Sequence, residues 1–341
     1  MNKVQGKKVI VTGGAGFIGS HVSDALLERG AEVVVVDDLS TCGREKIAHL
    51  DGASNFSLIV ADVRDEEAMN DAMIGADIVM HLATRNVRLS LSRPTEVHEV
   101  NVIGTYNVLK AAKRNAVSRF LYCSSSEVNG TAKEVPLKED YHFEPETIYG
   151  ASKLAGEYYT SVFQRSGWLD TVIARPHNSY GPREHADSHH GEVIPRFILQ
   201  ALSGKPMTIY GDGTQTRDFT YVTETAHYLI ELATHEETVG GIFNVCRGQE
   251  TSILDIAESI CQLTGLNQAP VLLPARPSDV LRLWGDATHL KKTLGSRPSI
   301  SIEDGLERTV NWFREHTDGH DETIAGSYDA MKQGLSKEDW L

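Results

Sequence analysis

The sequence predicts an α/β fold, a Rossmann-type doubly wound parallel sheet with a smaller C-terminal substrate-binding lobe. First, residues 32–37 (Glu-Val-Val-Val-Val-Asp) are β-branched without alternation, which is typical of a parallel strand buried on both faces. Second, comparable strands are expected at 8–12, 57–61, 78–82 and 120–124, with helix-like stretches such as 21–29 and 102–114 between them. Third, a glycine-rich turn follows the first of these runs. Strand–helix alternation of this kind builds a doubly wound sheet.

The regular alternation ends near residue 174. Residues 175–196 are rich in Pro, Gly, His and charge and are expected to form a loop. Beyond them we expect helices at 194–202, 223–232 and 254–263 and a short strand at 207–210. The predicted organisation is an NAD-binding Rossmann domain at 1–175 with later returns near 220–246, a substrate-binding lobe from 176–219 and 247–317, and a C-terminal tail at 318–341.

The composition excludes several classes of function. The chain has 33 Lys and Arg against 47 Asp and Glu, a net charge of −14, whereas a nucleic-acid binder carries a basic excess. No apolar run reaches the roughly 20 residues of a membrane span, and the polar first six residues run straight into a strand, so neither a membrane segment nor a signal peptide is expected. The four cysteines form no ligand cluster, which predicts reduced thiols, no metal and a cytoplasmic enzyme.

The turn at residues 12–19 reads Thr-Gly-Gly-Ala-Gly-Phe-Ile-Gly and is followed by a predicted helix. In such a turn, glycines like Gly13, Gly16 and Gly19 provide a tight turn, close approach of a pyrophosphate and close helix–strand packing. The helix N-terminus offers its amides to phosphates. Asp37 ends the next strand, where a carboxylate accepts bonds from the adenosine ribose and repels a 2′-phosphate. The prediction is therefore NAD rather than NADP, although the nearby Arg44 weakens that choice.

Other predicted cofactor contacts follow the later strands. Asp62 and Val63 come after the third strand and are placed to meet the adenine edge, although Asp62 is equally a simple turn residue. His81, Leu82 and Ala83 end the fourth strand at the edge where ligands of such folds bind, and His81 is interpreted as structural because no ligand partner is near it in sequence. The predicted set is completed by Phe17, Ile18, Thr84 and Asn101.

Tyr149 and Lys153 stand four residues apart and share one face of a predicted helix. A phenol has an unperturbed pKa near 10 and must act as a base near neutrality, so it needs a nearby positive charge such as the lysine ammonium or the nicotinamide. An ordinary surface pair would be the interpretation if the motif stood alone. It does not, because the serines of Ser124-Ser125-Ser126-Glu127 follow a core strand and precede Tyr149 by 23 to 25 residues.

With these motifs in view, the chain resembles the extended short-chain dehydrogenase/reductase family, the nucleotide-sugar epimerases and dehydratases. The resemblance spans about residues 8–290 and rests on the following pieces: residues 12–19, Asp37, residues 81–83, Asn101, Gly104-Thr105, residues 124–130, Tyr149, Lys153, residues 175–178, residues 180–183 and residues 215–219.

The resemblance implies a role for each matching residue. Tyr149 would deprotonate the sugar 4-hydroxyl as the C4 hydride passes to NAD. Lys153 would hold the nicotinamide ribose and lower the tyrosine pKa, and Ser125 would hydrogen-bond the same hydroxyl. The substrate diphosphate would be bound by Asn178 and Arg217, with Arg276 as a second phosphate ligand in a segment that runs to Asp279. The alternative for each arginine is a solvated surface residue.

Two positions depart from the family pattern. Asn129 replaces a tyrosine, and His177 replaces a phenylalanine in the Arg-Pro-Phe-Asn element. His177 is interpreted as a packing variant rather than a catalytic residue.

The resemblance leaves the reaction open. All such enzymes first oxidise C4, so a 4-epimerase is favoured as needing only Tyr149, Ser125 and room for the keto sugar to turn over. A 4,6-dehydratase follows closely, with Glu127 as the C5 base. A UDP-glucuronate decarboxylase is third, because Arg183 could bind a sugar carboxylate, although a phosphate or loop contact is the favoured interpretation of Arg183. The alternative from a different functional class is a scaffold protein that binds NAD but has no catalytic activity.

The resemblance also implies partners. A UDP-sugar is favoured because it is the more frequent case in the family, and neither nucleic acid nor membrane is expected as a partner. Relatives pair through the two helices that begin near Val102 and Ile148, so a homodimer is expected.

Overall fold

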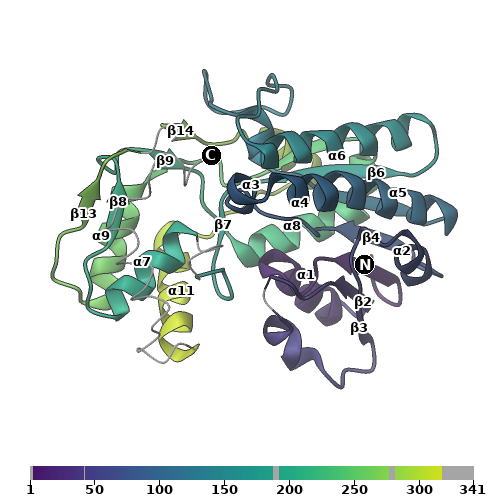
Figure 1. Ribbon diagram of the computed structural model, residues 1–341, viewed down its shortest axis with the longest axis horizontal. Helices are drawn as coiled ribbons and strands as arrows, with labels where there is room; N and C mark the ends of the chain where they lie inside the picture. The colour runs from purple at the N-terminus through teal and green to yellow at the C-terminus, as the bar shows by residue number, and fades with distance from the viewer. Residues whose placement is uncertain (1–2, 42, 187–191, 276–280, 317–341) are drawn as a thin grey trace.

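A parallel sheet of seven strands forms the centre of the molecule, confirming the predicted fold class (Figure 1). The computed structural model describes residues 3–41, 43–186, 192–275 and 281–316. The strand order is β11-β6-β5-β4-β1-β2-β3. In chain order these strands are β1 (Lys8–Thr12), β2 (Glu32–Asp37), β3 (Phe56–Val60), β4 (Ile78–His81), β5 (Arg119–Cys123), β6 (Thr171–Pro176) and β11 (Ile242–Val245).

Helices cover both faces of this sheet. On one face α1 (Phe17–Glu28) packs beside α8 (Val222–Thr234), and on the other lie α2 (Glu66–Ala72), α5 (Thr105–Arg114) and α6 (Ile148–Arg165). Successive strand residues alternate between the two cores, since Val9 and Val11 pack with the α1 side while Ile10 packs with the other. The unbroken apolar runs of the sequence follow from this burial on both faces.

Two local predictions were wrong, those for residues 57–61 and 175–196, whereas the predicted helix at 102–114 is helical but begins within a π-helical segment. Residues 57–61 were expected to be a buried strand, but β3 pairs with β2 only and lies at the sheet edge, where the side chain of Val60 is 63% exposed. Residues 99–104 wind as a π-helical segment, η2 (Glu99–Gly104), before α5 begins. Residues 175–196 are not one loop, because they contain the end of β6, the short strand β7 (Ser179–Tyr180) and the start of α7 (Val193–Leu202).

A second group of elements packs around its own apolar core, beside the carboxyl edge of the sheet (Figure 1). Its helices are α7, α9 (Ile253–Thr264) and α11 (Ile302–His316). Its short strands are β8 (Thr208–Tyr210), β9 (Thr216–Arg217), β10 (Thr220–Tyr221), β12 (Thr251–Ser252), β13 (Val271–Leu273) and β14 (Arg282–Leu283).

The remaining elements are short. They are η1 (Glu45–Leu50), α3 (Leu89–Ser92), α4 (Pro94–His98), η3 (Ser126–Asn129), η4 (Glu236–Thr238) and α10 (Thr288–Leu294). None of the helices in the described ranges is long and apolar enough to cross a bilayer.

A buried ion pair fixes α6 on the sheet. Arg175 in β6 is fully buried and donates from Nε to Glu157 Oε1 and from Nη2 to Glu157 Oε2, each at 2.7 Å. Glu157 Oε1 also accepts from Ser124 Oγ at 2.5 Å. A bidentate, additionally hydrogen-bonded pair of this kind satisfies both buried charges, whereas either charge alone would be costly.

We expect Glu157→Gln to lower the free energy of unfolding by about 3–5 kcal/mol, because it leaves the buried Arg175 guanidinium without a counter-charge. Urea unfolding followed by circular dichroism measures this. The control is Glu250→Gln, which breaks an exposed pair with Arg282 and should cost less than about 1 kcal/mol. Equal effects in the two variants would contradict the role given to Glu157.

Candidate functional site

A cavity of about 360 Å³ opens at the carboxyl ends of the central strands. Its walls come from the glycine turn after β1, the ends of β2 and β4, the serine segment after β5, the start of α6 and the segment after β6. In open parallel sheets ligands bind at this edge, so the topology itself places the site.

Two glycines of the turn are required by close packing. Gly13 has φ +71°, and a Cβ built on it would lie 2.6 Å from the backbone N of Ala83, in the loop after β4. A Cβ on Gly19 would lie 2.1 Å from the carbonyl oxygen of Gly13. Gly16 lines the cavity and caps α1, so the first amides of that helix face the place where a pyrophosphate would lie. The turn therefore has the close packing and the helix N-terminus that a dinucleotide site needs.

Asp37 lines the cavity beside this turn. One carboxylate oxygen accepts from Ala15 N at 3.0 Å and the other from Leu39 N at 2.9 Å. Burial raises the pKa of Asp37, and these two hydrogen bonds oppose the rise. The other predicted cofactor contacts that line the cavity are Gly13, Phe17, Ile18, Gly19, Val63, Leu82, Ala83 and Thr84.

Two predicted cofactor residues lie elsewhere. Asp62 accepts from the Arg64 guanidinium and is not among the described lining residues. Asn101 is buried behind the loop after β4, where it accepts from the backbone N of Arg85 at 2.7 Å and donates to Ser152 Oγ at 2.9 Å. Asn101 thus positions the lining loop against α6 in this structure.

The four predicted catalytic residues, Ser125, Tyr149, Lys153 and Glu127, all line the cavity. Ser125 hydrogen-bonds the Tyr149 side chain, and Lys153 Nζ donates to the carbonyl of Cys123 at 2.6 Å. Burial raises the pKa of Tyr149 above its usual value, and the bond from Ser125 opposes this; burial also lowers the pKa of Lys153. Without an added positive charge the tyrosine is therefore a neutral phenol, poised to lose its proton when a cation lies beside it.

Sequence reasoning missed four charged groups in the cavity wall, and one of them, Asp38, follows β2. Arg85 follows β4, while Glu184 and Glu192 flank the undescribed residues 187–191. Burial and the neighbouring Glu192 raise the pKa of Glu184 well above its usual value. Glu192 and the predicted Glu127 both act on Tyr149, because the charge of each raises the tyrosine pKa. No spacing pattern in the sequence connects these charged residues, because they come from separate segments of the chain.

The predicted substrate residues are divided. Asn178 lines the cavity, and its Nδ2 is buried with no hydrogen-bond partner in the described chain, as a group awaiting a ligand acceptor would be. Arg183 instead donates to Asp24 Oδ2 at 2.5 Å and to the Lys46 carbonyl at 3.0 Å, so it joins the segment after β7 to α1 and η1. Arg217 Nη1 donates to the Thr216 carbonyl. Arg276 and Asp279 lie outside the described residues.

Comparison with known proteins agrees with this geometry. The sequence profile described as "NAD dependent epimerase/dehydratase family" matches residues 9–246. UDP-glucuronic acid decarboxylase 1 of Xenopus tropicalis is 35% identical over 315 residues, which are 91% of this chain and 72% of that protein.

Two solved structures are similar over nearly their whole length. A UDP-glucose 4-epimerase of Thermotoga maritima, solved with UDP-glucose, superposes with a TM-score of 0.85 at 32% identity, covering 90% of this chain and 99% of that one. A double mutant of a dTDP-glucose 4,6-dehydratase of Streptomyces venezuelae, solved with NAD, gives 0.84 at 30% identity, covering 90% and 97%.

His177 lies directly behind the cavity wall and is fully buried. Neither ring nitrogen makes a hydrogen bond of good geometry with a described residue, and burial lowers the pKa of His177 to about 4, although the Asn244 side chain opposes this shift. The folded protein therefore holds a neutral, unsatisfied imidazole, which costs free energy.

We expect His177→Phe to raise the free energy of unfolding by about 1–3 kcal/mol at pH 7.5, because it removes two unsatisfied buried atoms. The gain should grow below pH 6.5. There the unfolded histidine takes up a proton that the folded one refuses, so the wild type loses a further ~1.4 kcal/mol per pH unit towards pH 4.

Urea unfolding at pH 7.5 and 5.5 measures both effects. The exposed His98 provides the control, since His98→Gln should leave the pH dependence as it is. If the stability of His177→Phe had the same pH dependence as that of the wild type, this would contradict the claim that His177 is neutral in the folded protein.

Proposed function

Because the chain belongs to the NAD dependent epimerase/dehydratase family, whose members of known activity are enzymes of nucleotide-sugar chemistry, we propose that it is a nucleoside-diphosphate-sugar 4-epimerase. A UDP-sugar is the proposed substrate class, as in the Thermotoga maritima structure. The observation that carries the proposal is the hydrogen-bonded Ser125–Tyr149 pair in a cavity that also contains Lys153.

The proposed roles follow from the contacts. The glycine turn and Asp37 would hold NAD, which would supply an acceptor for the C4 hydride and a positive ring that favours the Tyr149 phenolate. Tyr149 then removes the proton of the 4-hydroxyl, and Ser125 holds that hydroxyl in place. Lys153, buried beside the Cys123 carbonyl, keeps a positive charge close to the same place. Asn178 Nδ2 is the proposed donor to the substrate diphosphate.

The charges around Tyr149 support a neutral sugar over a uronate. The carboxylates of Glu127 and Glu192 both act on Tyr149. Among the described lining residues the cationic side chains are Arg85 and Lys153, and Arg85 is already paired with Asp38 and Glu96. Arg183, which by its sequence position is an alternative carboxylate ligand, is paired with Asp24. A sugar carboxylate here would meet like charges, which favours the epimerase over the decarboxylase.

A 4,6-dehydratase is the second candidate. One specific observation favours it: two carboxyl groups, Glu127 and Glu192, lie within electrostatic reach of Tyr149. Elimination of the sugar 6-hydroxyl needs a base at C5 and an acid at O6, and a pair of carboxyl groups can serve as both.

We expect purified protein with NAD to interconvert C4 epimers of a UDP-hexose without incorporating deuterium at C5, as followed by proton NMR in deuterated water. Tyr149→Phe should reduce the rate at least about 100-fold, because a general base contributes that much or more. NAD binding should survive this change, and its Kd is the control.

A 4-keto-6-deoxy product with deuterium at C5 would overturn the epimerase in favour of the dehydratase. Glu127→Gln would then abolish turnover, whereas an epimerase should keep most of its activity in this variant. Loss of a carboxyl group from UDP-glucuronate would identify a decarboxylase. No turnover of any nucleotide sugar would leave the NAD-binding scaffold.

A homodimer is part of the proposal. Apolar side chains gather on the outer surface of η2, α5 and α6, with exposed fractions between 39% and 48% for Ile103, Tyr106, Ile148, Tyr159 and Val162. Tyr106 and Tyr159 lie with ring centroids 5.5 Å apart, so the two helices present one continuous apolar surface. An apolar patch of this kind marks a surface that associates.

We expect sedimentation velocity to show a dimer, and Tyr159→Glu to shift it towards monomer by placing a charge in the interface. Ile74→Glu is the matched control, since Ile74 is 59% exposed after α2 and lies outside that surface. A monomeric wild type, or an equal effect of both variants, would contradict the proposal.

A further inference from the structure

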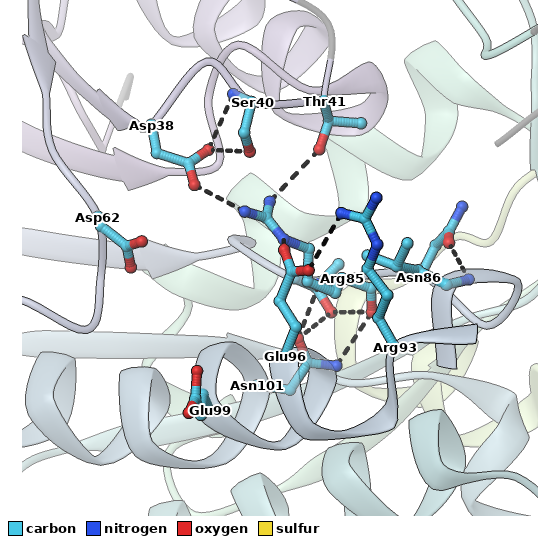
Figure 2. Close-up of polar contacts among 12 residues, drawn as sticks. Asp38, Ser40, Thr41, Asp62, Arg85, Asn86, Arg93, Glu96, Glu99 and Asn101 are labelled. Atoms are coloured by element: carbon cyan, nitrogen blue, oxygen red, sulfur yellow. Dashed lines mark hydrogen bonds and ion pairs between the residues drawn. The ribbon is translucent and has the colours of Figure 1, made fainter. Parts of the chain in front are cut away.

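Arg85 joins three segments at the adenosine end of the cavity (Figure 2). Its Nη2 donates to Asp38 Oδ2 and its Nε to Glu96 Oε1, each at 2.8 Å, and Nη1 lies 3.4 Å from Thr41 Oγ1. The loop after β4 is thereby tied to the loop after β2 and to α4. The Arg85 side chain is only 9% exposed, so these contacts are little screened by water.

The Asp38 carboxylate is fixed by hydrogen bonds on both oxygens, as the Arg85 guanidinium is fixed by its own contacts. Its Oδ1 accepts from Ser40 Oγ at 2.6 Å and from Ser40 N at 3.1 Å, while Oδ2 accepts from Arg85. Burial would raise the pKa of Asp38, but the bonds from Ser40 and Arg85 outweigh it and the pKa lies below its usual value. The carboxylate is therefore charged at neutral pH and faces the cavity.

The other arginines near this end of the site are also paired. Arg44, next to the loop after β2, donates to both oxygens of Asp51 at 2.6 and 2.7 Å. Arg64 is paired with Asp62 and Glu99. These two do not line the cavity, whereas Arg85 does. Of these three arginines, Arg85 is the one that lines the cavity, and it contacts the residue next to Asp37.

We propose that Asp38 sets the selectivity for NAD over NADP in two ways at once: its own charge repels a 2′-phosphate, and its ion pair with Arg85 withholds the cation that would otherwise bind that phosphate. In dinucleotide folds an arginine near the end of the second strand accommodates the 2′-phosphate of NADP. In this chain the arginine that reaches the end of the second strand is Arg85, which belongs to the loop after β4. Asp38 and Glu96 neutralise its charge. Asp37, with each oxygen on a backbone amide, is left to bind the ribose hydroxyls.

The two effects of Asp38 are separable. Glu96 does not line the cavity, so Glu96→Gln weakens the hold on Arg85 without removing the carboxylate that repels the phosphate. Asp38→Asn removes both effects while keeping the size of the side chain. In the double variant Asp38→Asn/Arg85→Gln the freed cation is absent, so only the loss of repulsion remains.

Isothermal titration of the purified full chain with NAD and with NADP gives the ratio of the two Kd values for each variant. Asp38→Asn should shift that ratio towards NADP by about ten-fold or more, the value of one charge-assisted hydrogen bond. Glu96→Gln should give a smaller shift in the same direction. The double variant should lose most of the shift. Glu231→Gln, which breaks the ion pair of Arg29 outside the cavity, is the matched control and should give none.

An unchanged ratio in Asp38→Asn would overturn the proposal, and so would a shift that persists in full in the double variant. Thermal unfolding of every variant shows whether it is folded. If Asp38→Asn does not fold, Glu96→Gln decides, since no shift there would remove the role of the withheld arginine. Because the readout is cofactor binding, its outcome is independent of whether the enzyme is an epimerase.

Discussion

The site depends on one buried interaction, the ion pair between Glu157 of α6 and Arg175 of β6. Tyr149, Lys153 and Glu157 follow one another at intervals of four along the same helix, so they share a face. Anchoring Glu157 to the sheet therefore fixes the two reactive side chains one and two turns before it. The Ser124 hydroxyl on Glu157 extends the same anchor to the segment that carries Ser125. The positions of the reactive side chains thus depend on an ion pair that is not among the described lining residues of the cavity.

Most of the charged side chains among the described lining residues are acidic, although the ligands to be bound are anionic. Backbone amides and the burial of carboxyl groups reduce the resulting repulsion. Phosphate groups are offered amides at the start of α1, where Gly13 and Gly19 allow the turn to approach the helix and the loop after β4. Among the carboxyl groups that would oppose them, Glu184 has a raised pKa. The proposed selectivity for NAD over NADP then depends on the ion pair between Asp38 and Arg85.

Much of this could be predicted from the sequence. Five of the seven strands of the sheet, the glycine turn, Asp37 and the Ser125–Tyr149–Lys153 set are encoded by local patterns, because each depends on residues close in sequence or on one helix face. What could not be predicted depends on contacts between distant segments. Arg183 reaches Asp24, 159 positions away, and Arg85 reaches Asp38, 47 positions away. The edge position of β3 is likewise a property of the strand order, since its composition matches that of an interior strand.

The position of β11 shows that the central sheet is not built from one continuous stretch of the chain. Residues 242–245 return, after the second group of elements has begun, to pair with β6 and complete the first sheet, and α8 covers that sheet beside α1. A polypeptide ending near residue 175 would lack both, and the edge of β6 and the apolar face under α8 would be open to other chains. The dinucleotide-binding half is thus contiguous in space but not in sequence, because β11 and α8 come from beyond residue 220.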